Sequence, residues 1–220
     1  MVKTGNTFID YLLLIITFIP LVPALLIIFQ KDHSKAPFNI LMVLCILDFI
    51  KGFSYQASLL DPINQNIITN IISLLELILF IQLFKNTLEK KIKDALKIFQ
   101  IAFLSSVFTW FSIKGWGQNN MILDSLLNGV LISVLLLSLP PLIRERDLGI
   151  LRSPLFWIAG GTLFYLLIAL LLEWIGPCCK IISGPVYTED YVFLSIAALI
   201  RYLLYLLAIL VTSKETTVDT

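Results

Sequence analysis

Residues 8–29 read FIDYLLLIITFIPLVPALLIIF, and this stretch decides the class of fold. Asp10 is its only charged residue, and its length suits a membrane-spanning helix, which needs about 20 apolar residues. The run is too long to be the apolar region of a cleavable signal peptide. We therefore expect residues 8–29 to form a retained first span, kinked at Pro20 and Pro23.

Six further apolar runs follow, separated by polar or turn-forming segments. Of the 220 residues, 58% are hydrophobic and 14% are charged, whereas a soluble domain carries about 25% charge. The chain is too short to hold these runs and a separate soluble domain as well. We predict an all-α membrane protein in which residues 1–220 form a single seven-helix bundle. The predicted spans are residues 8–29, 38–59, 67–84, 95–113, 121–142, 154–175 and 191–212.

The distribution of lysine and arginine between the loops predicts the orientation. One set of loops holds only Lys3, Lys114 and Lys180. Because cytoplasmic loops are enriched in basic residues, we expect an external N-terminus, a cytoplasmic C-terminus and a multi-pass protein of the cell's inner, cytoplasmic membrane. The other, basic set of loops holds Lys31, Lys35, Lys85, Lys90, Lys91, Lys93, Lys97, Arg144, Arg146, Arg152 and Lys214.

The residue inventory argues against several classes of protein. The chain has one histidine, His33, and three cysteines, whereas zinc and haem sites need several such ligands at set spacings. We therefore expect no metal and no cofactor. A net charge of +1 provides no general attraction to nucleic acid. The last span carries Arg201 and no lysine, which excludes a retinal protein that needs a Schiff-base lysine there.

Four charged residues fall inside predicted spans. Asp48 and Lys51 lie one turn apart on the same face of the second span, Glu76 in the third and Arg201 in the seventh. Each opposes insertion by about 2.5–3.5 kcal/mol at mid-span, so such groups face inward and pair. Their formal charges sum to zero. We therefore predict one interior network that links the second, third and seventh helices.

Other polar residues share these faces or lie in the outer halves of spans, and we predict that they border a ligand cavity open to the outer side. A network that only fixes helix packing is the alternative interpretation. The residues predicted for the cavity are Tyr55, Ser73, Asp124, Asn128, Glu173 and Tyr205.

The most basic segment is KNTLEKKIKDALK, which begins with Lys85 and ends with Lys97. Positive-inside anchoring in the bilayer explains such a segment. A docking surface for a cytoplasmic protein partner or for anionic lipid headgroups is the more specific alternative.

Two stretches resemble a known family. They are SPLFWIAGGTLFY at residues 153–165 and LLELILFIQLFK at residues 74–85. The chain is similar to an uncharacterised family of bacterial seven-helix integral membrane proteins, whose members carry a PLFW start to helix six and a mid-helix Glu in helix three. The resemblance implies a stand-alone seven-helix module related to the membrane-embedded sensor halves of bacterial signalling proteins. It implies no catalytic residues, because the family has no established activity.

Three functional hypotheses follow from the sequence. The first is a non-enzymatic, receptor-like or sensory module that binds a small or lipidic ligand from the outer side. The second is a small-solute or proton-coupled transporter with a three-plus-one-plus-three arrangement, suggested by paired prolines in the first and fifth spans and by Glu76 and Arg201 in the third and seventh. The third is a membrane lipid enzyme that uses the carboxylates of Asp48 and Glu76.

Overall fold

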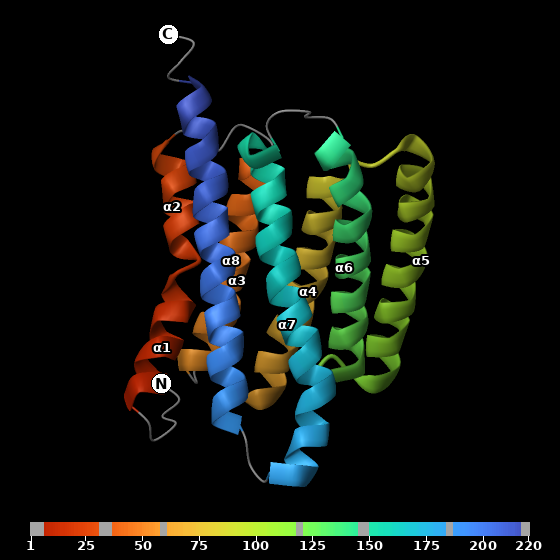
Figure 1. Cartoon of the computed structure of the whole chain (residues 1–220). Coiled ribbons are helices and arrows are strands. Elements are labelled where there is room, and N and C mark those ends of the chain that lie inside the picture. The colour runs from red at the N-terminus through yellow and green to blue at the C-terminus, as the bar shows by residue number, and fades with distance from the viewer. Residues whose placement is uncertain are drawn as a thin grey trace.

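The computed structural model is a bundle of long helices that run side by side (Figure 1). It describes residues 7–30, 37–57, 61–117, 121–144, 150–183 and 187–216. Within these ranges, side chains are described for all residues but 8, 9, 55–57, 121–123, 144, 173–183, 187–191 and 213–216. Every regular element in the described ranges is helical. The elements are α1 (Thr7–Phe18), α2 (Leu21–Phe29), α3 (Phe38–Ala57), α4 (Pro62–Phe84), α5 (Lys90–Lys114), α6 (Met121–Arg144), the short 3₁₀ helix η2 (Ile150–Arg152), α7 (Pro154–Ser183) and α8 (Tyr187–Thr216).

Six helical segments among the described residues are long and apolar enough to cross a membrane. Helix α3, which carries Asp48 and Lys51, is not among them although it is 20 residues long. The prediction of an all-α protein with several membrane spans is therefore confirmed, while the seventh span stays a prediction. The six segments are Asp10–Phe29, Pro62–Phe84, Lys90–Lys114, Asp124–Ile143, Pro154–Leu172 and Val192–Thr212.

The first predicted span is broken into α1 and α2 at Ile19 and Pro20. The chain forms a turn at this break, where the N–H of Val22 donates a hydrogen bond of 3.0 Å to the carbonyl oxygen of Ile19. Proline lacks the amide hydrogen that would continue the helix and its ring crowds the preceding turn. Pro23 lies in the first turn of α2, where a missing N–H leaves no helical bond unmade. The predicted kink is thus present as a break at Pro20.

Several helices extend beyond the predicted spans. Helix α4 begins at Pro62 rather than residue 67, because Pro62 suits the first helical position and Asp61 precedes it in an extended conformation. Helix α5 begins at Lys90 rather than residue 95, so part of the basic segment is helical. The first turns of these helices are rich in polar residues. A prediction of spans from runs of apolar residues therefore begins each helix too late.

The prolines in the later helices do not end them. Helix α6 continues through Pro140 and Pro141 to Arg144, and α7 continues through Pro177 to Ser183, beyond the predicted end at residue 175. Membrane helices tolerate proline because neighbouring groups satisfy the carbonyls that it frees. Helix α7 therefore continues into the segment expected to separate the sixth and seventh predicted spans.

Helices α7 and α8 approach each other closely at Gly161. A Cβ added there would lie 3.1 Å from the carbonyl oxygen of Arg201 and 3.1 Å from Cβ of Leu204, tighter than ordinary van der Waals contact. The hydroxyls of Thr162 and Tyr205 also join the two helices across 2.7 Å. Glycine at this position thus lets the backbone of α7 reach the turn of α8 that carries Arg201.

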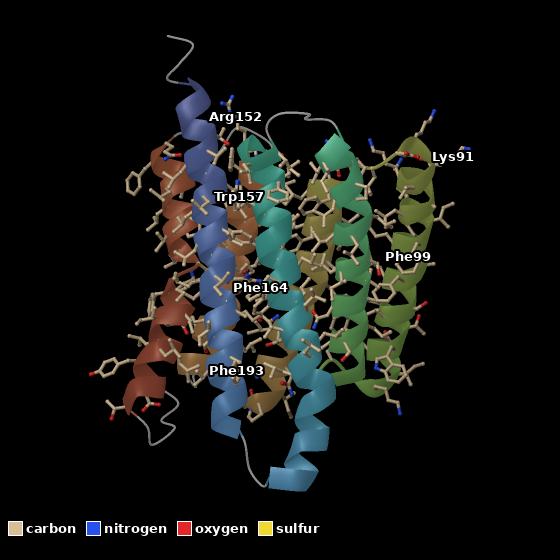
Figure 2. The ribbon with its side chains drawn as sticks, viewed as in Figure 1. Lys91, Phe99, Arg152, Trp157, Phe164 and Phe193 are labelled. Carbon is tan, nitrogen blue, oxygen red and sulfur yellow. The ribbon has the colours of Figure 1, made fainter. Side chains whose placement is uncertain are left out.

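Large apolar side chains cover the outside of the bundle. Ile98 and Ile113 of α5 are 72% and 75% exposed, and Phe99, Phe164 and Phe193 lie between the two ends of the bundle (Figure 2). Soluble proteins rarely expose contiguous apolar surface on this scale. The two labelled basic residues, Lys91 and Arg152, lie instead at one end (Figure 2).

Candidate functional site

A cavity of about 440 Å³ lies inside the bundle. Helices α1, α3, α4, α6, α7 and α8 contribute its walls, and Pro20 at the break between α1 and α2 also lines it. Small-molecule sites have volumes of roughly 300–1,000 Å³, so the space suits a ligand of modest size. The polar and charged residues of the lining are Thr17, Asp48, Lys51, Thr69, Ser73, Glu76, Asp124, Asn128, Thr162, Tyr165, Ser195, Arg201 and Tyr202.

Arg201 of α8 and Asp48 of α3 form the tighter of two ion pairs in this lining. Nη2 of Arg201 donates to Oδ2 of Asp48 at 2.7 Å, and the two side chains are 9% and 16% exposed. Nη2 also donates to the hydroxyl of Tyr202. The guanidinium carbon lies 4.3 Å from the ring centroid of Tyr165 and 4.7 Å from that of Tyr202, close enough for cation–π attraction. Arg201 is therefore held from several sides.

Lys51 of α3 and Glu76 of α4 form the looser pair. Their charged atoms, Nζ and Oε2, are 3.6 Å apart, and the side chains are 30% and 18% exposed. Nζ of Lys51 donates its hydrogen bond to Oγ of Ser73 at 3.0 Å. The separation of Lys51 and Glu76 exceeds normal hydrogen-bond length. Their attraction is therefore mainly that of two nearby charges.

Two atoms of these charged side chains are buried without a hydrogen-bond partner. They are Oε1 of Glu76 and Nε of Arg201, an acceptor and a donor. Among the described side chains, Oε1 of Gln30 is the only other atom that is buried without a hydrogen-bond partner. Buried polar groups are satisfied in the great majority of cases, so two such atoms in one cavity lining call for a functional explanation.

Asp124 and Asn128 of α6 line the same cavity. They lie one turn apart, with Asp124 in the first turn of the helix. Asp124 interacts electrostatically with Lys51, so α6 adds a second carboxylate to the side of the cavity that contains the looser pair. This carboxylate supplements the four charges that the sequence placed in one network.

The structure brings most of the predicted site residues together. Asp48, Lys51, Glu76 and Arg201 all line the cavity, as do Ser73, Asp124 and Asn128. Tyr205 lies beside the cavity, where its hydroxyl shares a hydrogen bond with the hydroxyl of Thr162. The centroid of its ring is 5.9 Å from the guanidinium carbon of Arg201. The side chains of Tyr55 and Glu173 lie outside the described residues.

Sequence reasoning missed the aromatic residues that hold Arg201. Tyr165 and Tyr202 occur in runs of apolar residues, where aromatic side chains are common in any membrane helix. One signal was present, because Thr162 and Tyr165 are three residues apart and so share a face of α7. That shared face would have predicted contact with Arg201 only if the sequence had also shown that α7 packs against α8 with Tyr165 and Arg201 at the same depth.

No group of three or more histidine, cysteine, aspartate or glutamate residues in the described part of the chain is placed to hold a metal ion. The polar groups that line the cavity are carboxylates, hydroxyls, the amide of Asn128, one lysine and one arginine. Such a set suits hydrogen bonding and charge pairing with an organic ligand.

No protein-family model matches the chain, and neither the curated proteins nor the solved structures contain a match to it. The family resemblance drawn from residues 74–85 and 153–165 therefore stays a prediction. The fold and the site nevertheless define a class. Six long apolar helical segments, five of which line a charged interior cavity together with α3, are those of a polytopic membrane protein.

Proposed function

We propose that the protein is a receptor-like membrane module that binds a small ligand in the cavity between α1, α3, α4, α6, α7 and α8. The observation that carries this proposal is the cavity of about 440 Å³ with five charged side chains in its lining. A charge network that only fixed helix packing would need no such space. Ionisable groups at membrane depth commonly mark ligand or ion sites.

The loose pair is suited to report that the ligand is bound. A ligand shifts a conformational equilibrium only if it binds one state better than the other. Lys51 and Glu76 join α3 to α4 without a direct hydrogen bond, so a ligand that engages Glu76 changes the forces between these helices. We propose that this change passes to the cytoplasmic end, where residues 85–97 contact a protein partner.

The proposal includes a membrane topology. We propose that α3 is a seventh span and that the N-terminus is external in the cytoplasmic membrane. In support, Lys91 and Arg152 lie at the same end of the bundle (Figure 2). Asp124, in the first turn of α6, lies toward the opposite end, where α6 begins (Figure 1). Cysteines substituted for Lys35, Lys90 and Arg146 are expected to react with impermeant thiol reagents from the cytoplasm only, and external labelling would reverse the orientation.

A cavity-filling substitution tests ligand binding. Ala169 lines the cavity, so Ala169→Leu is expected to abolish the thermal stabilisation that any cavity ligand confers on the purified protein. Ala102→Leu makes the same change at an exposed position of α5 and serves as the matched control. A library of small polar and amphiphilic compounds supplies the ligands. If no compound stabilises the unsubstituted protein, or if stabilisation survives Ala169→Leu, the cavity is not a binding site.

A transporter is the second candidate, and the break at Pro20 favours it. Discontinuous helices beside a mid-membrane cavity are common in secondary transporters, and Pro20 lines this cavity. A transporter opens the same cavity alternately to both sides. Sustained solute counterflow in liposomes that contain only this protein, abolished by Glu76→Gln, would favour the transporter over the receptor.

A further inference from the structure

We infer that the ligand is a small amphiphilic amine, bound as its ammonium ion beside Glu76 and Asp124. This inference rests on the proposed function and names the chemistry of the ligand. Three features of the cavity support it, namely the charge balance of the lining, the two unpartnered atoms and the apolar walls.

The charge balance favours a cation. The charged residues of the described lining are three carboxylates, on Asp48, Glu76 and Asp124, and two basic groups, on Lys51 and Arg201. The lining therefore carries one formal negative charge in excess. An uncompensated charge at membrane depth is costly, and a singly charged ammonium ion would neutralise this one.

The hydrogen-bond inventory places the ammonium group. Asp48 is engaged by Arg201 at 2.7 Å, so it is the least available of the three carboxylates. Oε1 of Glu76 is buried without a partner, and Oε2 is 3.6 Å from Lys51, whose amine bonds Ser73 instead. An ammonium group offers several donors, and it would satisfy Glu76 while lying close to the carboxylate of Asp124.

The second unpartnered atom indicates an oxygen on the ligand. The side chain of Arg201 is only 9% exposed and lines the cavity, yet its Nε has no acceptor. A hydroxyl or ether oxygen close to the ammonium group would accept this hydrogen bond. The cavity thus presents an acceptor and a donor without partners, and an amino alcohol offers the complementary pair.

The apolar walls account for the rest of the ligand. Leu77 and Phe80 of α4, Leu127 and Leu131 of α6 and Leu166 of α7 all line the cavity. An apolar body packed against them would gain burial energy. Either a free amino alcohol or the headgroup of an aminophospholipid supplies the same ammonium and oxygen, so the experiment must separate these two sources.

Three probes of nearly equal size test the inference on the purified full-length protein in detergent. Phenylethanolamine is the cation, phenylethylene glycol the neutral analogue and mandelate the anion. Binding is measured by calorimetry and by thermal stabilisation. Phenylethanolamine is expected to bind about tenfold or more tightly than the glycol, the factor that corresponds to one charged hydrogen bond, and mandelate is expected to bind most weakly.

Substitutions locate the ammonium group. Glu76→Gln and Asp124→Asn are each expected to weaken phenylethanolamine about tenfold or more while leaving the glycol unchanged. The controls Glu89→Gln and Asp94→Asn make the same changes at exposed positions and are expected to change neither affinity. If the Glu76→Gln variant does not fold, the affinity of Asp124→Asn for phenylethanolamine tests the inference by itself. Asp124 belongs to neither ion pair, so its substitution leaves both pairs intact.

Reconstitution identifies the source of the amine. Phenylethanolamine binding is compared between nanodiscs of phosphatidylethanolamine and nanodiscs of phosphatidylglycerol. Weaker binding in phosphatidylethanolamine would support a lipid headgroup as the ligand, and equal binding in the two lipids would support a free amine. Preferred binding of mandelate or the glycol, or no binding of any probe, would overturn the inference. If library compounds still bind and are lost in Ala169→Leu, the proposed function stands although the ammonium chemistry fails.

Discussion

The two ion pairs of the cavity have the same formal charges but very different surroundings. Arg201 and Asp48 are joined by a hydrogen bond of 2.7 Å, and the guanidinium also contacts Tyr165 and Tyr202. Lys51 and Glu76 are 3.6 Å apart and share no hydrogen bond. The first pair is thus enclosed by fixed partners, whereas the second has room and unused hydrogen-bonding capacity.

This difference separates a structural element from a responsive one. A buried ion pair whose partners are fixed resists rearrangement, because removal of either partner strands the other charge in a medium of low dielectric constant. A looser pair that already has a second hydrogen-bond partner can exchange partners at less cost. We therefore assign the positioning of α3 against α8 to Arg201 and Asp48, and the response to ligand to Lys51 and Glu76.

The largest effect is expected from Arg201→Met. This change leaves the Asp48 carboxylate without its cation, and breaking a buried pair in this way costs about 3–5 kcal/mol. A steep fall in the thermal unfolding temperature of the detergent-solubilised protein would show it. Arg152→Met, at an exposed position, is the control, and the double variant Asp48→Asn with Arg201→Met should recover part of the loss. An unchanged unfolding temperature would refute the structural role of the tight pair.

A smaller effect is expected from Gly161→Ala, which tests how Arg201 is positioned. The added methyl group would press on the carbonyl oxygen of Arg201 and on Cβ of Leu204, each at 3.1 Å. Neither atom can move independently of the helix, so the expected loss is about 1–3 kcal/mol.

Gly160→Ala provides the control for that prediction in the adjacent residue. No atom lies within 4 Å of a Cβ built there. Replacing a helical glycine with alanine then favours folding by about 0.5–1 kcal/mol. Equal effects of the two substitutions, measured by thermal unfolding, would show that the close approach of α7 and α8 does not determine stability.

The smallest loss of stability among the three destabilising substitutions is expected from Glu76→Gln, at about 1 kcal/mol. Lys51 keeps its hydrogen bond to Ser73 and its attraction to Asp124, so its charge is not stranded. Thermal unfolding measured beside Arg201→Met gives the comparison directly. If Glu76→Gln destabilised the protein as strongly as Arg201→Met, the two pairs would be equivalent and the proposed division of roles would fail.

Much of the architecture was predictable because the signals are local. A run such as residues 8–29 needs only its own apolar side chains to specify a membrane helix, and Pro20 breaks that helix by removing its own amide hydrogen. The helix ends were less predictable. The first turns of α4 and α5 are polar, and the continuation of α7 through Pro177 depends on neighbours that satisfy the freed carbonyl.

The sequence by itself determined that this protein is helical, that it belongs in a membrane and that Asp48, Lys51, Glu76 and Arg201 must face inward, because the insertion penalty of a charge acts on each helix separately. The tertiary structure alone decided which of these charges pair. Asp48 and Arg201 are 153 positions apart in the chain, and their contact depends on how α3 and α8 are rotated and on the close approach at Gly161. The aromatic residues around Arg201, the unpartnered oxygen of Glu76 and the cavity between them arise in the same way, because they depend on packing among several helices.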